Sequence, residues 1–402
     1  MRPLLTLLHR VVGLALAGFL ALAGLTGAVI ALYHEIDEGL NPQLYETPAR
    51  GAPLATDELV ARIERADPRA RVSGIPVGTP AGRAAVARVV PREVSDDPLG
   101  FDEVFVDPVS GAIVGKRQWG ACCFGREELV PFLYVLHYSL HLPERAGVVL
   151  MGCVGVAWVV DCFVALALTF PRGGSFWRRW RRAFRVEAGA SRYRLLHDVH
   201  QATGLWLWPL LLLLAVSGVA LSLRDEVFRP VVALFSSLSP TAEERARTLG
   251  LAPGPRTRTL GDAIAAAREI ARARGVPAEP VYAFHDAEVG GFAIGFVRPG
   301  EDPGVGMGAS WITVGDGDLR FVSAEVTGEG SAGDVFAQLQ FPLHSGHLLG
   351  FPGRVAVSLL GLATAGLAGT GITVWWMKRR ARRAGARGRL AVGVGGTAGG
   401  AA

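Results

Sequence analysis

The sequence is short of charged residues and of cysteine. Charged side chains make up 19% of the 402 residues, below the roughly 25% of soluble domains. The four cysteines show no zinc or iron–sulfur spacing, and the chain has no glycine-rich phosphate loop, dinucleotide fingerprint or recognisable Ser–His–Asp arrangement. These absences exclude a disulfide-rich secreted mini-domain and leave the chain without a flavin or nicotinamide domain of its own.

Hydrophobic residues are abundant: they make up 50% of the sequence and concentrate in four runs. The runs cover residues 11–33, 146–170, 205–223 and 355–377, and only Asp161 interrupts the second. Each has 19 to 25 residues, enough for a helix to cross about 30 Å of hydrocarbon. The first is too long for a typical signal-peptide core. The sequence therefore predicts four transmembrane helices and excludes a single soluble globule or a disordered chain.

Arginine predicts how these helices are oriented. Residues 171–194 hold eight arginines and one acid, the tail after the fourth run begins KRRARRAGARGR, and the short N-terminus carries Arg2 and Arg10. Such basic segments mark the cytoplasmic side of a membrane. Because they flank spans, they predict orientation rather than nucleic-acid binding, and they place both termini in the cytoplasm.

Two long segments between the spans are predicted to be α+β domains. In each, a helical stretch, at 55–68 or 259–275, precedes strand-like stretches joined by Gly, Asp and Pro turns, at 84–91 and 101–115 or at 280–297 and 310–326. The predicted division, in chain order, is transmembrane helix 1–34, periplasmic α+β domain 35–144, transmembrane helix 145–171, basic cytoplasmic loop 172–194, transmembrane helix 195–223, second periplasmic α+β domain 224–353, transmembrane helix 354–377, and a basic, then disordered, cytoplasmic tail 378–402.

An internal repeat relates the two halves of the chain. Equivalent positions recur in the same order: His9 with His200, Thr26 with Ser217, Glu35 with Asp225-Glu226, and His137 with His344. Both halves begin on the same side of the membrane. The pattern therefore predicts a four-helix transmembrane bundle built of two parallel helix–domain–helix repeats, related by an axis near the membrane normal.

Eight of the nine histidines lie at or near the ends of the predicted spans, and His285 alone lies well inside an outer segment. A single histidine near a span end is tolerated without a function. Ionisable groups that cluster at membrane depth and recur in a repeat indicate a functional site. The cytoplasmic ends carry His9, His197 and His200, and the outer ends carry His34, His137, His141, His344 and His347.

Opposed histidines from different helices favour a bis-histidine haem, because a flat macrocycle needs two axial ligands and an apolar slot. A zinc site usually has four ligands, with cysteine or carboxylate among them. No C-x-x-C-H motif occurs, so the predicted cofactor is haem b, without covalent attachment. The repeat predicts two haems: His9 and His200 hold the inner one, and His137 and His344 hold the outer one.

The neighbouring histidines are open alternatives. His34, His141, His197 and His347 are candidates for ligands, for groups that contact ligands, or for contacts to haem propionates. His141 follows His137 by four residues and would share its face if that stretch were helical. Glycines along the first and fourth spans either let helices pack closely or make room for a flat cofactor.

Two other features of the sequence have more than one interpretation. Asp161 in the second span either orients a ligand histidine, carries protons, or is a neutral acid with a local hydrogen bond. Cys122 and Cys123 are adjacent, and a disulfide between neighbours is strained. We therefore expect these two cysteines to be free or to pair with another chain.

Several stretches resemble PepSY-associated transmembrane proteins. They are LLHRVVGLALAGFLALAGLTGAVIAL with the following Asn41-Pro42, FVDPVSGAIVG, VLHYSLH, HDVHQATGLW and PLHSGHLLGFPGR, and the resemblance covers about residues 5–385. It implies a protein of the bacterial inner membrane that is tied to iron uptake. Some members are similar to ferric-siderophore reductases with two b haems between four helices.

For this chain the resemblance implies electron passage from a cytoplasmic or membrane donor to a periplasmic ferric siderophore. The matching positions are His9, His200, His137 and His344. Such a protein would be a transmembrane oxidoreductase whose partners are the lipid bilayer, the electron donor and the siderophore, with no nucleic acid. Two other functions fit the sequence. A non-catalytic member would bind or regulate envelope proteins or peptidases, and a metal or proton transporter would line its path with histidines and Asp161.

Overall fold

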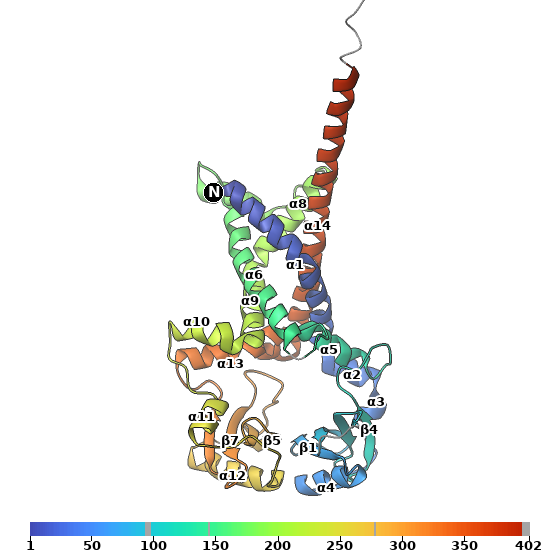
Figure 1. Ribbon diagram of the computed structural model, residues 1–402, viewed down its shortest axis with the longest axis vertical. Helices are drawn as coiled ribbons and strands as arrows, with labels where there is room; N and C mark the ends of the chain where they lie inside the picture. The colour runs from blue at the N-terminus through green and yellow to red at the C-terminus, as the bar shows by residue number, and fades with distance from the viewer. Residues whose placement is uncertain (93–97, 144, 277–278, 396–402) are drawn as a thin grey trace, which may run out of the picture. The chain divides into compact units, whose positions relative to one another are not determined.

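The computed structural model describes residues 1–92, 98–143, 145–276 and 279–395 (Figure 1). The chain divides into two compact units. The helical unit comprises Met1–Ala28, His137–Ser222 and Ser358–Ala402, and the sheet unit comprises Val29–Leu136 and Leu223–Val357. Each unit therefore combines segments from both halves of the chain.

The helical unit is built from long apolar helices (Figure 1). The helices α1 (Arg2–Ile30), α6 (Ala146–Thr169) and α14 (Gly350–Gly395) are long and apolar enough to cross a membrane. A fourth span is formed by α8 (Arg192–Trp206) and α9 (Trp208–Ser222) if this bent pair is counted as one. The chain is therefore a membrane protein, as the apolar runs predicted.

The third predicted span is broken rather than straight. The axes of α8 and α9 differ by 67°. Pro209 lies in the first turn of α9, where its missing N–H and its ring interrupt the helical hydrogen-bond ladder. Just before it, the Trp208 indole donates to the Cys162 carbonyl of α6 at 2.8 Å. The break lets α8 diverge from the line of α9 and carry polar residues into the bundle.

Glycines decide how closely two of these helices approach. A Cβ atom added to Gly24 in α1 would lie 2.5 Å from the Gly361 carbonyl oxygen in α14, and one added to Gly361 would lie 2.6 Å from the Gly24 oxygen. Ser358 in α14 donates to the Ala28 carbonyl of α1 at 2.7 Å. These glycines serve close helix packing, one of the two roles that the sequence left open.

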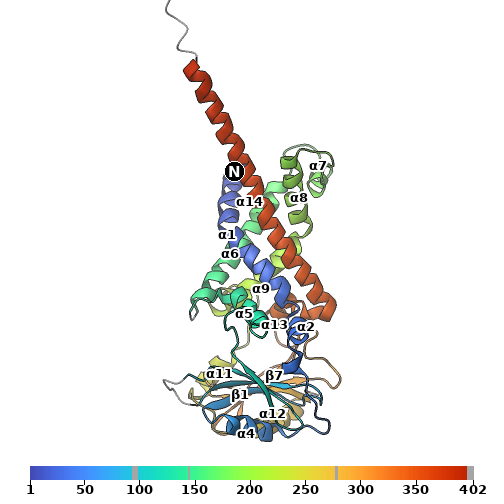
Figure 2. The same cartoon turned by 90° about the vertical axis from the view of Figure 1, so that its right-hand side faces the viewer.

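The sheet unit is centred on one antiparallel sheet of eight strands in the order β4-β3-β2-β1-β5-β6-β7-β8. Figure 2 shows α4 (Thr56–Ala66) and α12 (Leu260–Ala273) on the same face of this sheet. Leu59 and Ile63 of α4 pack with alternate strand residues in one apolar core. The strands are β1 (Ala70–Pro76), β2 (Ala85–Pro91), β3 (Glu103–Val106), β4 (Ile113–Arg117), β5 (Glu279–Asp286), β6 (Gly291–Val297), β7 (Ser310–Gly315) and β8 (Phe321–Glu325).

The two predicted outer domains share this sheet. They meet where β1 pairs with β5, with Gly74 opposite Phe284 and Pro76 opposite Tyr282. The sequence analysis located the other strands and both helices but missed β1, whose seven residues follow α4 directly. The α+β class is consistent with the structure, and the parallel repeat stays a prediction.

Short helices connect the main elements. Thr259 begins α12 by accepting a hydrogen bond from the Asp262 amide at 3.0 Å, an N-cap that the sequence TLGD encodes locally. The basic part of the C-terminal tail is helical, α14 ends at Gly395, and residues 396–402, most of the segment predicted to be disordered, lie outside the described residues. The remaining elements are α2 (Tyr33–Leu40), α3 (Pro42–Tyr45), α5 (Leu129–Ser139), α7 (Phe176–Trp180), η1 (Arg181–Phe184), η2 (Arg224–Phe228), α10 (Arg229–Ala233), α11 (Ala242–Thr248), α13 (Ala332–Ser345) and η3 (His347–Leu349).

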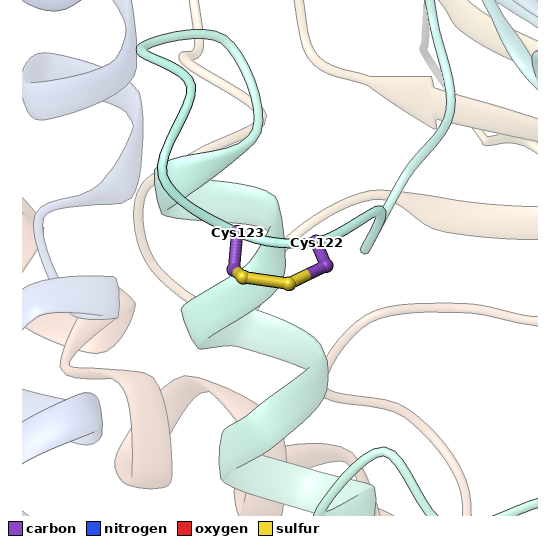
Figure 3. Close-up of a disulfide and its surroundings, with 2 residues drawn as sticks. All are labelled: Cys122 and Cys123. Atoms are coloured by element: carbon purple, nitrogen blue, oxygen red, sulfur yellow. A yellow bond between two sulfur atoms is a disulfide. The ribbon is translucent and has the colours of Figure 1, made fainter.

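The expectation for the adjacent cysteines was wrong. Cys122 and Cys123 are joined by a disulfide in the loop before α5 (Figure 3). The expectation assumed a trans peptide bond, which holds neighbouring Cα atoms about 3.8 Å apart. The bond between these two residues is cis, and their Cα atoms are 3.1 Å apart.

Candidate functional site

A cavity of about 800 Å³ lies within the helical unit. Five helices line it: α1, α6, α8, α9 and α14. Its walls are mainly apolar, as expected for a site that holds a flat organic group. The apolar lining includes Leu14, Ala17, Leu20, Ala165, Leu211, Leu367 and Ile372.

Two histidines from different helices face each other in this cavity. His9 of α1 and His200 of α8 both line it, and their ring centroids are 6.3 Å apart with an angle of 47° between the ring planes. The broken third span makes this possible, because α8 begins at its own N-cap, Ser191, and brings His200 into the bundle. The structure thus brings together the couple that the repeat paired at the inner face.

Asp161 orients the first of these histidines. Both of its carboxylate oxygens lie 3.0 Å from Nδ1 of His9, and the residue is only 8% exposed. A carboxylate accepts hydrogen bonds and donates none, so the proton is on Nδ1 and the lone pair is on Nε2. This contact is compatible with either an orienting or a proton-carrying role for Asp161, and a ligand role for His9 stays a prediction.

Neutral groups orient the second histidine. Nδ1 of His200 lies 3.1 Å from the Leu367 carbonyl oxygen and 3.1 Å from Oγ1 of Thr370, both in α14. A backbone carbonyl can only accept, so Nδ1 of His200 also carries the proton. Both rings are therefore held through Nδ1, which leaves Nε2 without these contacts, and a partner at one ring nitrogen is typical of histidines that bind metals.

Small residues leave room around the two rings. A Cβ atom added to Gly371 in α14 would lie 3.2 Å from Cε1 of His200, closer than an ordinary contact. A Cβ atom on Gly13 in α1 would lie 4.0 Å from a carboxylate oxygen of Asp161. Gly371 thus leaves room for the ring of His200, and room for a flat cofactor stays a prediction.

Basic side chains also line the cavity. They come from the first turns of α1 and from the turns of α14 that follow Trp375. Arg2 is held by the carbonyl oxygens of Phe170 and Leu168, at 2.8 and 2.6 Å. The cavity is therefore apolar in its walls and cationic in one part of its lining. The basic residues are Arg2, Arg10, Lys378, Arg379, Arg382 and Arg383.

His197 is the third histidine of this cavity. Its side chain is about half-exposed, and Nδ1 lies 3.6 Å from Asp198. Asp198 forms an ion pair with Arg194 at 2.9 Å, one turn earlier in α8. The ring of His197 is therefore held less firmly than the rings of His9 and His200, and His197 stays a candidate contact for an anionic group.

The histidines predicted for the outer face belong to both units. His137 lies in the last turn of α5, and its Nδ1 lies 3.0 Å from Oγ1 of Thr26 in α1. A Cβ atom on Gly27 would lie 3.0 Å from Cε1 of this ring. His141 does not share the helical face of His137, because α5 stops at Ser139 and His141 has a φ of 53°. The condition for a shared face, a helix that continues through His141, is therefore not met.

The other outer candidates lie in the sheet unit. His34 is in α2, with its ring centroid 3.7 Å from that of Tyr33. His344 is near the end of α13. His347 opens η3, accepts or donates a hydrogen bond with Ser345 at 2.7 Å through Nδ1, and stacks on Phe341. The role of each as a ligand stays a prediction.

Sequence reasoning missed part of the inner site. The carbonyl of Leu367 and the hydroxyl of Thr370 orient His200, and neither has a sequence signal, since every residue carries a carbonyl and threonine is common in spans. Within the described residues, no group of three or more His, Cys, Asp or Glu side chains could hold a metal ion. The inner couple is thus a two-histidine arrangement rather than a zinc-like cluster.

The sheet unit also buries a network of charged side chains. Arg117 is 2.8 Å from Glu103 and 2.9 Å from Asp37, and all three side chains are at most 3% exposed. Tyr45 donates to Asp37 at 2.5 Å. Burial raises the pKa of Glu103 above its ordinary value, although Arg117 and Arg88 oppose the shift. The network ties α2, β3 and β4 together.

A comparison with known protein families gives a match over most of the chain. The sequence profile of a family described as the PepSY-associated TM region matches residues 6–378. No curated protein matches the chain. The matched region includes His9, Asp161 and His200, and it covers the cavity except for a few residues at its basic edge.

Proposed function

Because the chain belongs to the PepSY-associated transmembrane family, we propose that it carries electrons through two b haems across the bacterial inner membrane to a ferric siderophore. Its termini would lie in the cytoplasm, as the arginine-rich segments predict. The observation that carries the proposal is the facing couple of His9 and His200 in an apolar cavity.

The spacing of this couple fits one metal atom bound between two imidazoles. Two ring nitrogens on opposite sides of a metal, each about 2 Å from it, put the ring centres roughly 6 Å apart. The centroids of His9 and His200 are 6.3 Å apart. Both rings are held through Nδ1, which leaves Nε2 for the iron. The residues present therefore fit haem.

The rest of the cavity fits the other parts of a haem. Apolar walls suit the macrocycle, and Gly371 provides space beside His200 that a side chain would fill. The cationic part of the lining suits two propionate groups, because arginine and lysine offset carboxylate charge in a low-dielectric site. Four cysteines without a C-x-x-C-H motif leave non-covalent, b-type binding.

Each residue of the site has one task in this proposal. When bound, a haem with two histidine ligands transfers one electron at a time and has no open position for oxygen. His9 and His200 bind the iron, while Asp161 and Leu367 hold the protons on Nδ1 and so fix the ring orientations. The apolar walls exclude water, and the basic residues hold the propionates.

The outer half of the path rests on the sequence. The repeat assigns a second haem to His137 and His344, with His34, His141 and His347 as alternatives and His197 as the inner alternative. Each ferric ion would take one electron and become ferrous, which binds an anionic siderophore less tightly because its charge is lower. The electrons would come from a cytoplasmic or membrane donor.

Haem content of the purified protein tests the proposal. We expect the wild type to show the absorption of six-coordinate, low-spin b haem and to contain two haems. His9→Ala and His200→Ala should each remove one haem, whereas His197→Ala, at the same cavity, should retain both. A correctly folded protein without haem would contradict the proposal.

Two alternatives remain for a protein without haem. A non-catalytic role would place the function in the sheet unit, which would then bind envelope proteins or peptidases. Proton transport is favoured by one observation, the buried contact of Asp161 with His9 in the span region. Proton flux into vesicles that contain the purified protein would distinguish these two.

A further inference from the structure

The segment that follows α6 combines aromatic and basic residues. Residues 176–185, which include α7 and η1, read FWRRWRRAFR and contain five arginines and no acid. Aromatic side chains recur at 176, 180 and 184, a spacing of four that places them on one side of a helix. The arginines lie between them. The aromatic–basic segment, as we call residues 176–185, is therefore amphipathic.

The aromatic rings of this segment form a connected cluster with the ends of two neighbouring helices. The ring centroid of Phe170, which caps the C-terminus of α6, lies 5.7 Å from that of Trp180. Trp180 lies 5.2 Å from Phe184, and Phe184 lies 5.2 Å from Trp206, the last residue of α8. All three pairs meet edge to face, an arrangement that aromatic rings favour. The cluster thus joins the end of α6 to the end of α8.

Hydrogen bonds hold the segment in the same place. The Trp180 indole donates to Oγ1 of Thr169 in α6 at 2.9 Å, and the Trp206 indole donates to the Phe184 carbonyl at 3.2 Å. A tryptophan with an apolar ring and a hydrogen-bonded N–H is typical of the boundary between hydrocarbon and water. Because α6 is long and apolar enough to cross a membrane, a segment tied to its end would lie at that boundary.

The basic side of the segment is exposed and has no acidic partner in the described part of the chain. Arg178, Arg181, Arg182 and Arg185 are exposed, and among the described residues their guanidinium groups form no ion pair or hydrogen bond. Trp177, next to Arg178, is 72% exposed. A guanidinium group binds phosphate oxygens through two parallel N–H groups. The segment thus presents several cations beside exposed aromatic surface.

Both features match an anionic phospholipid. The lipid phosphate pairs with arginine, and the apolar part of the lipid suits aromatic rings at the membrane boundary. A zwitterionic phospholipid also carries a phosphate, but its own ammonium group cancels the charge, so it is attracted less by a cluster of arginines. An acidic soluble protein would match the arginines but not an aromatic cluster tied to the end of an apolar helix.

We propose that the aromatic–basic segment is a binding site for anionic phospholipid at one end of the helical unit. The guanidinium groups bind the phosphate, and the exposed tryptophan lies against the lipid. This site is separate from the histidine cavity, and it does not depend on whether the protein binds haem.

Competition between two lipids tests this site. The full-length protein, in an uncharged detergent, is given equal amounts of phosphatidylglycerol, which is anionic, and phosphatidylcholine, which has no net charge. Native mass spectrometry counts the lipids of each kind that stay bound. We expect the wild type to retain an excess of phosphatidylglycerol. Raising the ammonium acetate concentration should reduce this excess, because salt screens the pairing of exposed charges.

Two variants with the same change in net charge locate the site. The segment variant replaces four arginines of the aromatic–basic segment: Arg178→Gln, Arg181→Gln, Arg182→Gln and Arg185→Gln. The control variant replaces four exposed arginines of the sheet unit: Arg65→Gln, Arg247→Gln, Arg272→Gln and Arg298→Gln. The segment variant should bind phosphatidylglycerol at least about tenfold more weakly, because each basic residue adds to the attraction. The control variant should keep the wild-type preference.

Several outcomes would overturn the proposal. Equal retention of the two lipids by the wild type would do so, as would an equal loss of phosphatidylglycerol binding in the two variants. Displacement of the lipid by inorganic phosphate at a matching concentration would indicate a site for free phosphate instead. Unchanged lipid binding in a segment variant that has lost binding of an acidic protein would identify a protein partner. The salt dependence needs no variant, and an excess that salt leaves unchanged would contradict charge pairing.

Discussion

Gly24 and Gly361 bring α1 and α14 into backbone contact. A Cβ atom on Gly24 would be 2.5 Å from the carbonyl oxygen of Gly361, a distance that the two helices can relieve only by moving apart. The pair lies in the helical unit with the cavity, so the approach of these two helices also bears on the space between His9 in α1 and Gly371 in α14.

We therefore expect Gly24→Ala to destabilise the helical unit by about 1–3 kcal/mol, the usual cost of overpacking. Thermal unfolding in detergent would measure the loss. Gly18→Ala is the matched control in the same helix, because a Cβ atom there meets no described atom within 4 Å. Equal stability of the two variants would contradict the close approach.

A second prediction concerns the buried ions of the sheet unit. Arg117→Met keeps much of the side-chain volume but leaves Asp37 buried without its cation and leaves Glu103 with Arg88 alone. Removing one partner of a buried pair costs about 3–5 kcal/mol. We expect a loss of that size in denaturant unfolding of the full protein. Arg65→Met, at an ion pair whose arginine is 68% exposed, should cost less than about 1 kcal/mol.

The pH dependence of stability should reflect His285. This side chain in β5 is 5% exposed, and its Nε2 has no hydrogen-bond partner among the described residues. Burial lowers the pKa of His285 below its ordinary value. The unfolded chain then binds a proton more readily than the folded one. The free energy of unfolding should therefore fall as the pH drops below about 6.5 toward the folded-state pKa.

Urea unfolding at pH 7.5 and at pH 5 would measure this effect. His285→Phe, which retains a ring against Phe292, should lose less stability between the two pH values than the wild type. His141→Phe replaces an exposed histidine and should show the wild-type dependence. A wild-type slope in His285→Phe would show that other groups cause the acid sensitivity.

Gly371 gives a steric test of the inner site. A side chain at this position would press on His200, whose Cε1 atom is 3.2 Å from the site of the Cβ. Gly371→Val should therefore displace the ring and reduce the haem content, while Gly369→Val, where a Cβ meets no described atom within 4 Å, should not. The pyridine haemochrome assay measures both. Equal haem content in the two variants would argue against His200 as a ligand.

The sequence predicted the features that depend on local patterns. Long apolar runs located α1, α6 and α14. Helical stretches located α4 and α12, and alternating stretches joined by turn residues located most strands. The resemblance to the PepSY-associated family is confirmed by the match over residues 6–378. Each of these signals is contained in a short window of residues, so no knowledge of the fold was needed.

Other features followed from contacts between distant residues. The pairing of β1 with β5 made one sheet of two predicted domains, and no pattern within either segment specifies that edge. The sequence also placed His9, His200 and Asp161 near span ends or within a span, but it left the hydrogen-bond partner of each side chain undetermined. Asp161 reaches His9 across 152 residues, and a backbone carbonyl reaches His200 across 167. Composition and spacing thus determined a membrane protein with histidines at its helix ends. Only the packing of the helices decided which histidine receives a charged partner, because that choice depends on where backbones cross.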